Sequence, residues 1–390
     1  MRILFIDWGN YGKEDIKSAM TDEGHEVISF PFEASSSLIW EQLIHEPETE
    51  AGLRNTLHDR TPDVVFSVNY FPVISRVCQA EHIRYISWSY DGPYILLYSN
   101  TINNSCNRVY VFDREMYLEF CRAGITTVYY MPLAVNTKRL ELMDQKLASL
   151  PPLSYDVSFV GSFYLEKGSC FEQIETALPE YSRGYLKAMI GVQLKIQGYD
   201  MIEEMLPFIL NDLYKAYPVK PLTEGRQPKG FFYEYHVIKP WITTIERIDL
   251  LEAVAAKYTV DLFSHTKDFT TPGLHNHGPV DYFHEMPLVF KQSKINLNMT
   301  MRGIKSGIPL RAFDIMGAGG FLISNYQEGF LEYFVPGEDF VYYESKEDLL
   351  AKVEYYLSHD EERKAIARNG HEKVAASHTY RHRIGEMLNF

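Results

Sequence analysis

The stretch from Lys294 to Ser324 constrains the fold more than any other part of the chain. Alternating apolar residues predict a strand at its start, a polar loop with glycine runs from Thr300 to Pro309, and helical spacing follows from Leu310 to Met316. Three glycines then end the helix, and a second apolar run begins a new strand. The pattern predicts a β–α–β crossover, which is the repeating unit of parallel sheets.

The loop before this helix predicts a phosphate-binding site. The helix opens after Ser306 and Gly307, so its unpaired backbone N–H groups and the positive end of its dipole point into the loop. Lys305 and Arg311 flank this position and add positive charge. Asp314 shares a helix face with Arg311 and could accept hydrogen bonds from sugar or ribose hydroxyls. An ordinary crossover whose glycines only make turns is the alternative, and spacing alone leaves both open.

Length and composition narrow the class of protein. A chain of 390 residues is long enough for two domains, and its net charge of -14 argues against a nucleic-acid partner. The 4 cysteines lack CxxC spacing, so neither a metal site nor a disulfide framework is predicted. No apolar run is long enough to span a membrane, and we therefore expect a cytoplasmic protein.

Strands and helices alternate through the first part of the chain, which predicts a doubly wound parallel sheet. Ligands of such sheets lie beyond the carboxyl ends of the strands. Gly9 and Asn10 follow the first strand and could approach a ligand phosphate, although the loop lacks a GxGxxG pattern. Asp91 follows a later strand and is a candidate site residue, or else a turn carboxylate, because Asp-Gly is common in turns.

A second α/β unit is expected after Pro151-Pro152. The loop after its first strand carries Lys167, and a later strand ends at Ser264 and His265, and these three residues are candidates for binding the nucleotide ligand. Helical spacing between about 170 and 256 exceeds what a minimal domain of this kind needs, which predicts a helical insertion. The insertion could shape an acceptor site or an oligomer contact such as a homodimer interface, and the sequence does not choose between them.

Several motifs together resemble the GT-B glycosyltransferases. They are the opening strand, loop and helix that end in GHEV, and the segments PLAVNTKRL, DVSFVGSFYLEKG, SGIPLRAFDIMGAGGFLI and PGEDFVYY. The match spans nearly the whole chain and is closest to the group described as spore maturation protein CgeB-like. It implies an α/β fold with two Rossmann-like doubly wound domains that face each other across a cleft. Residues 1–150 would form the acceptor side, 151–375 would bind the nucleotide sugar, and 376–390 would return to the N-terminal domain.

The resemblance also implies roles for individual residues. Asp314 stands where larger retaining families place a ribose-binding glutamate, and Asp91 stands near the position of a catalytic histidine or aspartate. Lys167 and Arg311 are the candidates for the diphosphate, with Arg311 also counted as catalytic. Ser306 departs from the family pattern, which has glutamate there, so the stereochemical outcome stays open.

The implied activity is transfer of a hexose from a nucleotide sugar to a hydroxyl of a glycan, a protein or a small molecule. UDP is the commonest nucleotide in this fold, and neither a metal nor a permanently bound cofactor is expected. Two alternatives remain at this point. One is a sugar-nucleotide epimerase or phosphorylase on the same frame, and the other is a non-catalytic protein that binds nucleotides or glycans.

Overall fold

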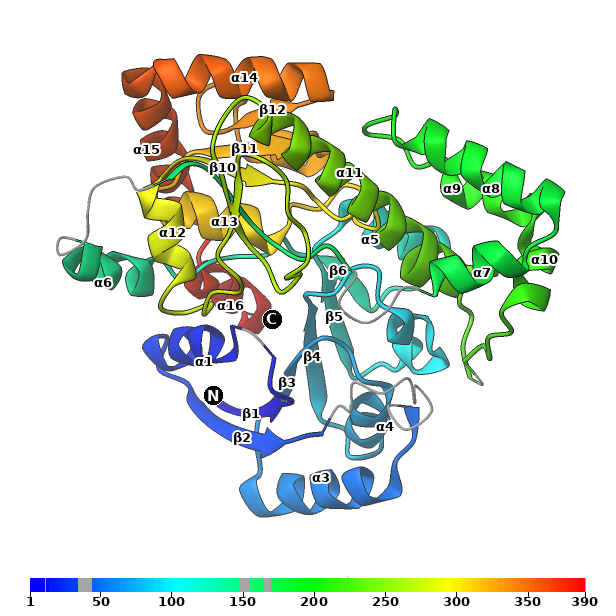
Figure 1. Cartoon of the computed structure of the whole chain (residues 1–390). Coiled ribbons are helices and arrows are strands. Elements are labelled where there is room, and N and C mark those ends of the chain that lie inside the picture. Colours follow the sequence, from blue (N-terminus) through cyan, green and yellow to red (C-terminus); the bar gives the residue numbers. More distant parts are fainter. Residues whose placement is uncertain (11, 34–43, 148–154, 165–169, 223, 390) are drawn as a thin grey trace. The chain divides into compact units, whose positions relative to one another are not determined.

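The computed structural model of the chain (Figure 1) describes residues 1–10, 12–33, 44–147, 155–164, 170–222 and 224–389. The chain divides into two compact units. The first contains Met1–Ala134, Lys220–Lys229 and Thr379–Phe390, and the second contains Val135–Val219 and Gly230–His378. The division therefore falls after Ala134, whereas the sequence predicts a domain boundary near residue 150. A short segment after Val219 also belongs to the first unit.

The first unit is built on a parallel sheet of 6 strands in the order β2-β1-β3-β4-β5-β6. Every residue of β3 is buried, as expected for a strand covered on both faces. Helices α1 and α16 pack together, as do α3 and α4. The bounds are β1 Arg2–Asp7, β2 Glu26–Pro31, β3 Val64–Val68, β4 Arg84–Ser89, β5 Asn107–Val111, β6 Val128–Tyr130, α1 Lys13–Asp22, α3 Pro47–Arg60, α4 Pro72–Ala80, α5 Arg114–Arg122 and α16 Tyr380–Leu388.

The second unit holds another parallel sheet of 6 strands, in the order β12-β11-β10-β7-β8-β9. Helices α11 and α14 pack on one face of it, and α12 and α13 contact its other face. The bounds are β7 Tyr155–Val160, β8 Val260–Phe263, β9 Leu274–Asn276, β10 Ser293–Asn298, β11 Leu322–Asn325, β12 Val341–Tyr343, α6 Thr137–Leu147, α11 Lys239–Ala255, α12 Met286–Gln292, α13 Leu310–Gly317, α14 Lys346–Ser358 and α15 Asp360–Ser377.

Both sheets confirm the predicted α/β fold with two Rossmann-like units. In each sheet the strand order reverses beside the first strand of the unit, between β1 and β3 and between β7 and β10. Loops on the two sides of such a reversal lead away in opposite directions, so a crevice forms outside the carboxyl ends of these strands. A ligand site is therefore expected at the carboxyl edge beside each of these two reversals.

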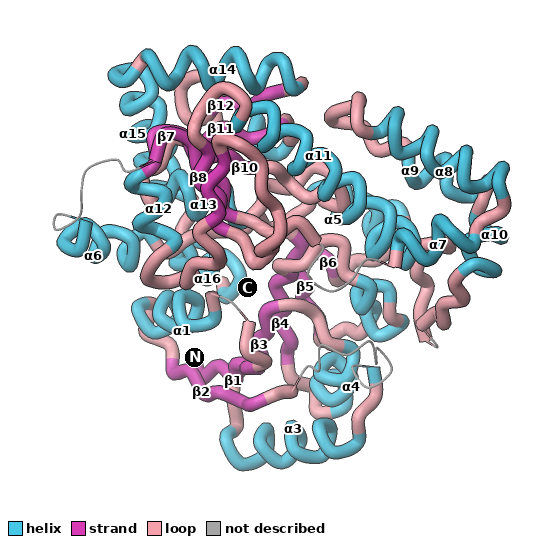
Figure 2. Tube along the Cα trace, in the orientation of Figure 1, coloured by secondary structure: helices cyan, strands magenta, loops and turns pink. Residues whose placement is uncertain are grey.

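The predicted helical insertion is present within the second unit. Figure 2 shows α7 Phe171–Ala177, α8 Glu180–Gln193, α9 Ile202–Met205 and α10 Leu210–Ala216 grouped beside the start of α11. These helices share an apolar core of their own with residues such as Ile238 and Ile242. The later part of α11 packs instead against the sheet through Leu250, Leu251 and Val254. The start of α11 therefore belongs to the core of the insertion and its later part to the core of the sheet, within the range of about 170 to 256 expected from the spacing.

Gly370 gives a test of packing in the second unit. A Cβ atom at Gly370, within α15, would lie 2.3 Å from the carbonyl oxygen of Asp339, whereas one at Gly385, within α16, would meet nothing within 4 Å. We expect Gly370→Ala to lower the free energy of unfolding by about 1–3 kcal/mol, because the backbone has to shift. Gly385→Ala, the matched control, should raise it by about 0.5–1 kcal/mol. Urea denaturation of both variants measures the difference, and equal midpoints would contradict the packing.

Candidate functional site

The strand reversal in the second unit places one loop at the centre of the carboxyl edge. β7 and β10 are neighbours, and the loop from Met299 to Pro309 leads from β10 into α13. Pro309 is the N-cap of α13, and no side chain caps the helix. The N–H of Ala312 donates to the carbonyl oxygen of Pro309 at 3.0 Å, so the N–H groups at the very start of the helix, those of Leu310 and Arg311, are the ones that can meet an anion at this edge.

Arg247 of α11 holds the two central strands together at this edge. Its guanidinium donates hydrogen bonds to the carbonyl oxygens of Ser162, after β7, and Met299, after β10. The side chain is 7% exposed and its guanidinium lies 5.4 Å from the ring centre of Phe159. A buried charge bonded to two carbonyls fixes the point from which both loops leave the sheet.

A second arginine, which is partly buried, fixes the loop itself. Arg302 forms two parallel hydrogen bonds to the carboxylate of Glu246, from Nε at 2.9 Å and from Nη2 at 2.7 Å. Its Nη1 donates to the carbonyl oxygen of Ile196 at 3.0 Å, and its backbone N–H donates to Thr243 Oγ1. The loop after β10 is thus bonded both to α11 and to the helical insertion.

Three of the predicted residues lie in this loop. Lys305 forms an ion pair with Glu203 of α9 at 2.7 Å. Ser306 and Gly307 are buried, and the carbonyl oxygen of Ser306 accepts from the N–H of Gly329 at 2.9 Å. A Cβ atom at Gly329 would come within 2.4 Å of that oxygen, so the loop packs tightly against the segment that contains Gly329. The predicted strand, loop and helix are present here.

Arg311 and Asp314 meet on α13, as the helical spacing indicates. Arg311 Nη1 lies 3.3 Å from Asp314 Oδ2, and Tyr282 donates to Asp314 Oδ1 at 3.0 Å. Asp314 is 4% exposed and both of its oxygens are engaged, whereas the side chain of Arg311 is 28% exposed. Asp314 is thus held by neighbouring side chains on both of its oxygens.

The remaining predicted residues of the second unit lie at the end of β8. Ser264 is buried and accepts from the N–H of Thr266 at 3.2 Å, so its hydroxyl shapes a turn. His265 lines a pocket of about 530 Å³ together with Phe163, Phe269 and others. Phe163 and Phe269 pack with ring centres 4.9 Å apart. Lys167 lies outside the described residues.

Gly9 and Asn10 follow β1 in the first unit. Asp7 at the end of β1 accepts from Lys13 at 2.7 Å and from Lys17 at 2.8 Å, and the N–H of Gly9 also donates to it. Partial burial acts to raise the pKa of Asp7, but the hydrogen bonds from both lysines and from Gly9 lower it to about 2. Gly9 has φ 80°, a conformation that glycine adopts without strain.

Asp91 follows β4 on the same edge of the first sheet. Asn69, after β3, donates to Asp91 Oδ2 at 2.7 Å and accepts from the N–H groups of Tyr90 and Asp91 at 2.8 and 3.1 Å. Asp91 keeps an exposed surface, but loss of solvation raises the pKa of its carboxyl above the ordinary value, and the hydrogen bond from Asn69 opposes the rise. An exposed carboxylate with a raised pKa is suited to accept a proton.

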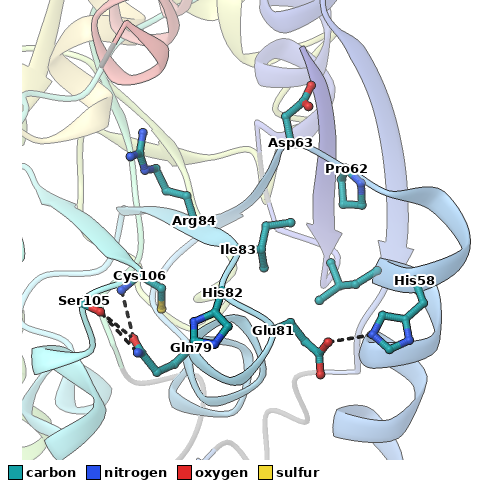
Figure 3. A pocket seen from close by; sticks show the side chains of 11 residues that line it. His58, Pro62, Asp63, Gln79, Glu81, His82, Ile83, Arg84, Ser105 and Cys106 are labelled. Carbon is teal, nitrogen blue, oxygen red and sulfur yellow. Dashed lines mark hydrogen bonds and ion pairs between the residues drawn. The ribbon is translucent and has the colours of Figure 1, made fainter.

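The first unit has a polar hollow of about 730 Å³, and Figure 3 shows the side chains that line it. Asp63, Arg84 and Cys106, which line it, precede or begin β3, β4 and β5, so the hollow lies at the amino ends of these strands. Glu81 at its rim pairs with His58 at 2.7 Å. Since Asp91 and Asn10 lie at the carboxyl ends, this hollow is separate from the predicted site residues.

Metal-binding clusters and membrane-spanning helices can be assessed for the residues that the structure describes. Among them, no three His, Cys, Asp or Glu side chains are arranged to hold a metal ion. Within the same ranges, no helix combines the length and the apolar character required to cross a bilayer.

Sequence reasoning missed Asn69, Glu246 and Arg247. Asn69 carried a usable signal, because it directly follows a buried strand. Glu246 and Arg247 lie in a helix whose charged residues suggest a solvated face. Only the tertiary structure shows that Arg247 is buried and that Glu246 is largely covered by its ion pair with Arg302. The residues that position the loop therefore come from outside the motif.

Comparisons with known proteins support the sequence resemblance. Residues 247–389 match the model of a family described as glycosyl transferase-like. Sucrose-phosphate synthase from Thermosynechococcus elongatus is similar in structure, with TM-score 0.55 and 11% identity, over 99% of this chain and 98% of that chain. The Anabaena protein HepE in complex with UDP and glucose gives TM-score 0.55 and 12% identity, over 100% and 99% of the two chains.

A third similar structure is WaaG, a glycosyltransferase involved in lipopolysaccharide biosynthesis, with TM-score 0.53 and 10% identity over 99% of this chain and 98% of that chain. At such identities the likeness establishes the fold, and it confirms the expected GT-B fold along the chain. No curated protein matches the chain. The narrower resemblance to CgeB-like proteins stays a prediction.

Asp7 allows a test of the loop that carries Gly9. The folded-state pKa of about 2 lies below the ordinary 3.8, so the ionised carboxylate stabilises the fold above about pH 4, and this stabilisation is lost as the pH falls toward 2. We expect Asp7→Asn to lower the free energy of unfolding by about 2 kcal/mol at pH 7 and by progressively less below pH 4. Asp59→Asn, at an exposed position of α3, is the control. A pH-independent loss in urea denaturation would refute the ionic origin.

Proposed function

We propose that this protein is a glycosyltransferase that moves a hexose from a UDP-linked sugar to a hydroxyl of a glycan, a protein or a small molecule. The observation that carries the proposal is the uncapped start of α13, held by Arg247 and Arg302 at the strand reversal of the second sheet. The likeness to glycosyltransferase structures over the whole chain supports it, as does the family match of residues 247–389.

The donor diphosphate binds at the first turn of α13 in this proposal. Backbone N–H groups, Lys305 and Arg311 neutralise its charge, which is the role that a metal ion has in other transferases. Arg311 is partly exposed beside this turn, so a diphosphate can attract its guanidinium away from Asp314. Asp314 then has an oxygen available for the ribose. Phosphate and ribose binding are thereby coupled through one ion pair.

The nucleoside lies toward the end of β8, where the pocket beside His265 offers aromatic walls. Lys167, by resemblance, adds charge to the diphosphate site. A UDP-linked donor is favoured because the similar Anabaena structure contains UDP and glucose.

Asp91 is the proposed general base in the first unit. The acceptor hydroxyl oxygen attacks the anomeric carbon and its proton passes to Asp91, while the bond from that carbon to the diphosphate oxygen breaks and its electron pair leaves with the diphosphate. Asn69 holds Asp91 in place through its hydrogen bond and through the two backbone N–H groups it accepts from. Gly9 and Asn10, on the same edge, contact the donor or acceptor.

A thermal-shift screen tests the donor site. UDP, GDP, dTDP, CDP and ADP are each added with and without Mg²⁺, and a nucleotide at 100 times its Kd stabilises by about 2.7 kcal/mol. We expect a shift with UDP that Mg²⁺ does not alter. A UDP-dependent shift without transfer to any hydroxyl acceptor would favour the non-catalytic alternative. Absence of a shift with all five nucleotides would refute the donor site.

Variants of α13 separate the two proposed donor contacts. Arg311→Ala should lower kcat by roughly 10²–10³, because it removes charge stabilisation of the leaving diphosphate. Asp314→Asn should weaken UDP binding by roughly tenfold, because it removes one charged hydrogen bond. Lys294→Ala is the control, since Lys294 starts β10 at the opposite edge and pairs with Asp156. Titration calorimetry and steady-state rates measure both effects, and variants with unchanged values would overturn the assignment.

The pH dependence of transfer tests Asp91. A base acts in its ionised form, so the rate should rise with pH through the pKa of Asp91, which lies above 3.8. Asn69→Ala removes the hydrogen bond that lowers this pKa, and the acid limb of kcat should then move to higher pH. Asn104→Ala, whose amide donates to Ser75, should leave the limb in place. An acid limb that survives in Asp91→Asn would assign the base to another residue.

A further inference from the structure

One face of α8 in the helical insertion is exposed and apolar. Tyr181 is 76% exposed and Val192 is 45% exposed, while Gly184, Ala188 and Gly191 between them are also exposed. With 3.6 residues per turn these five residues project from one side of the helix. Nothing lies within 4 Å of a Cβ atom added at Gly184 or Gly191, so the space above the helix is open.

The apolar face extends beyond α8. Phe208, in the short 3₁₀ turn Leu206–Phe208, is 75% exposed, and its ring centre lies 6.1 Å from that of Tyr185. Tyr185 in turn lies 6.4 Å from Tyr181. We call this set the α8 surface; it consists of Tyr181, Gly184, Tyr185, Ala188, Gly191, Val192 and Phe208. Contiguous exposed aromatic and aliphatic side chains of this kind mark an interaction surface.

The α8 surface is complementary to itself. Tyr181 precedes Ala188 by as many residues as Lys195 follows it, and Gly184 and Val192 are likewise symmetric about Ala188. If a second α8 lies antiparallel across Ala188, each Tyr181 ring meets a Lys195 ammonium and the small residues at the centre allow close approach. Lys195 lies in the turn directly after α8, and Glu180 of one copy then comes within one residue of the level of Lys195 of the other. Within the described residues neither Glu180 nor Lys195 forms an ion pair, and both are exposed.

We propose that the α8 surface binds the same surface of a second copy of the chain, with the two α8 helices antiparallel about a two-fold axis at Ala188. The charge pattern favours this partner, because acidic and basic ends exchange places only when the same helix is reversed. One helix and one turn bury less area than a standard interface, so the dimer dissociates on dilution. The proposal is independent of the transferase activity.

Sedimentation equilibrium over a concentration series tests the dimer. The wild-type chain should form dimers as its concentration rises, and Ala188→Arg should raise the dimer Kd on the order of a hundredfold, because two like charges face each other at the axis. Ala351→Arg makes the same change at an exposed position of α14 and should leave Kd unchanged. A monomeric wild-type chain, or equal effects of both variants, would overturn the proposal.

Charge exchange provides the more specific test. Glu180→Lys and Lys195→Glu should each weaken the dimer by roughly tenfold, and the double variant should bring Kd back toward the wild-type value, because the cross-axis pair is re-formed with reversed signs and only the contact of Lys195 with Tyr181 stays lost. Circular dichroism confirms that each variant is folded. Additive losses in the double variant would mean that the two side chains do not meet, which would refute the antiparallel arrangement. Dimers that survive both changes would place the interface elsewhere.

Discussion

Two backbone carbonyls at the strand reversal of the second sheet depend on one side chain. Ser162 and Met299 follow β7 and β10, and the buried Arg247 donates a hydrogen bond to the carbonyl oxygen of each. An unpaired carbonyl or an unpaired guanidinium at this depth would be costly, so each stabilises the other. The loops that leave these strands start from fixed positions because of it. The start of α13, at the end of the loop from Met299, is positioned in the same way.

Two ion pairs at the same edge differ in how firmly they are held. Arg302 and Glu246 hold the loop before α13, and this largely covered pair contributes geometry more than stability, because its Coulomb energy is offset by lost solvation. Arg311 and Asp314 are different, because their contact is longer and the arginine is partly exposed. The rigid pair positions the loop, and the looser pair can exchange partners with a ligand. The proposed donor site requires both behaviours.

Local patterns predicted much of this molecule correctly. Apolar runs of strand length identified the strands that flank the predicted sites, and the glycines after Met316 identified the end of α13. The spacing of Arg311 and Asp314 predicted their contact, because residues three apart meet on a helix. Patterns of this kind could not find Asn69 beside Asp91, since the two come from different strands. They also could not show that Arg247 is buried and that Glu246 pairs with Arg302, because a charged helix usually faces solvent.

The sequence by itself determined the α/β class, the pairing of two parallel sheets and the loop that precedes α13, because these follow from local periodicity and from the conformations of glycine and proline. Tertiary structure decided which groups are engaged there. It showed that Asp314 is occupied by Tyr282 and Arg311, and that Arg247 reaches two strands from a distant helix. Such contacts join segments remote in the chain, and their existence depends on how the sheet and its helices pack, which no local pattern encodes.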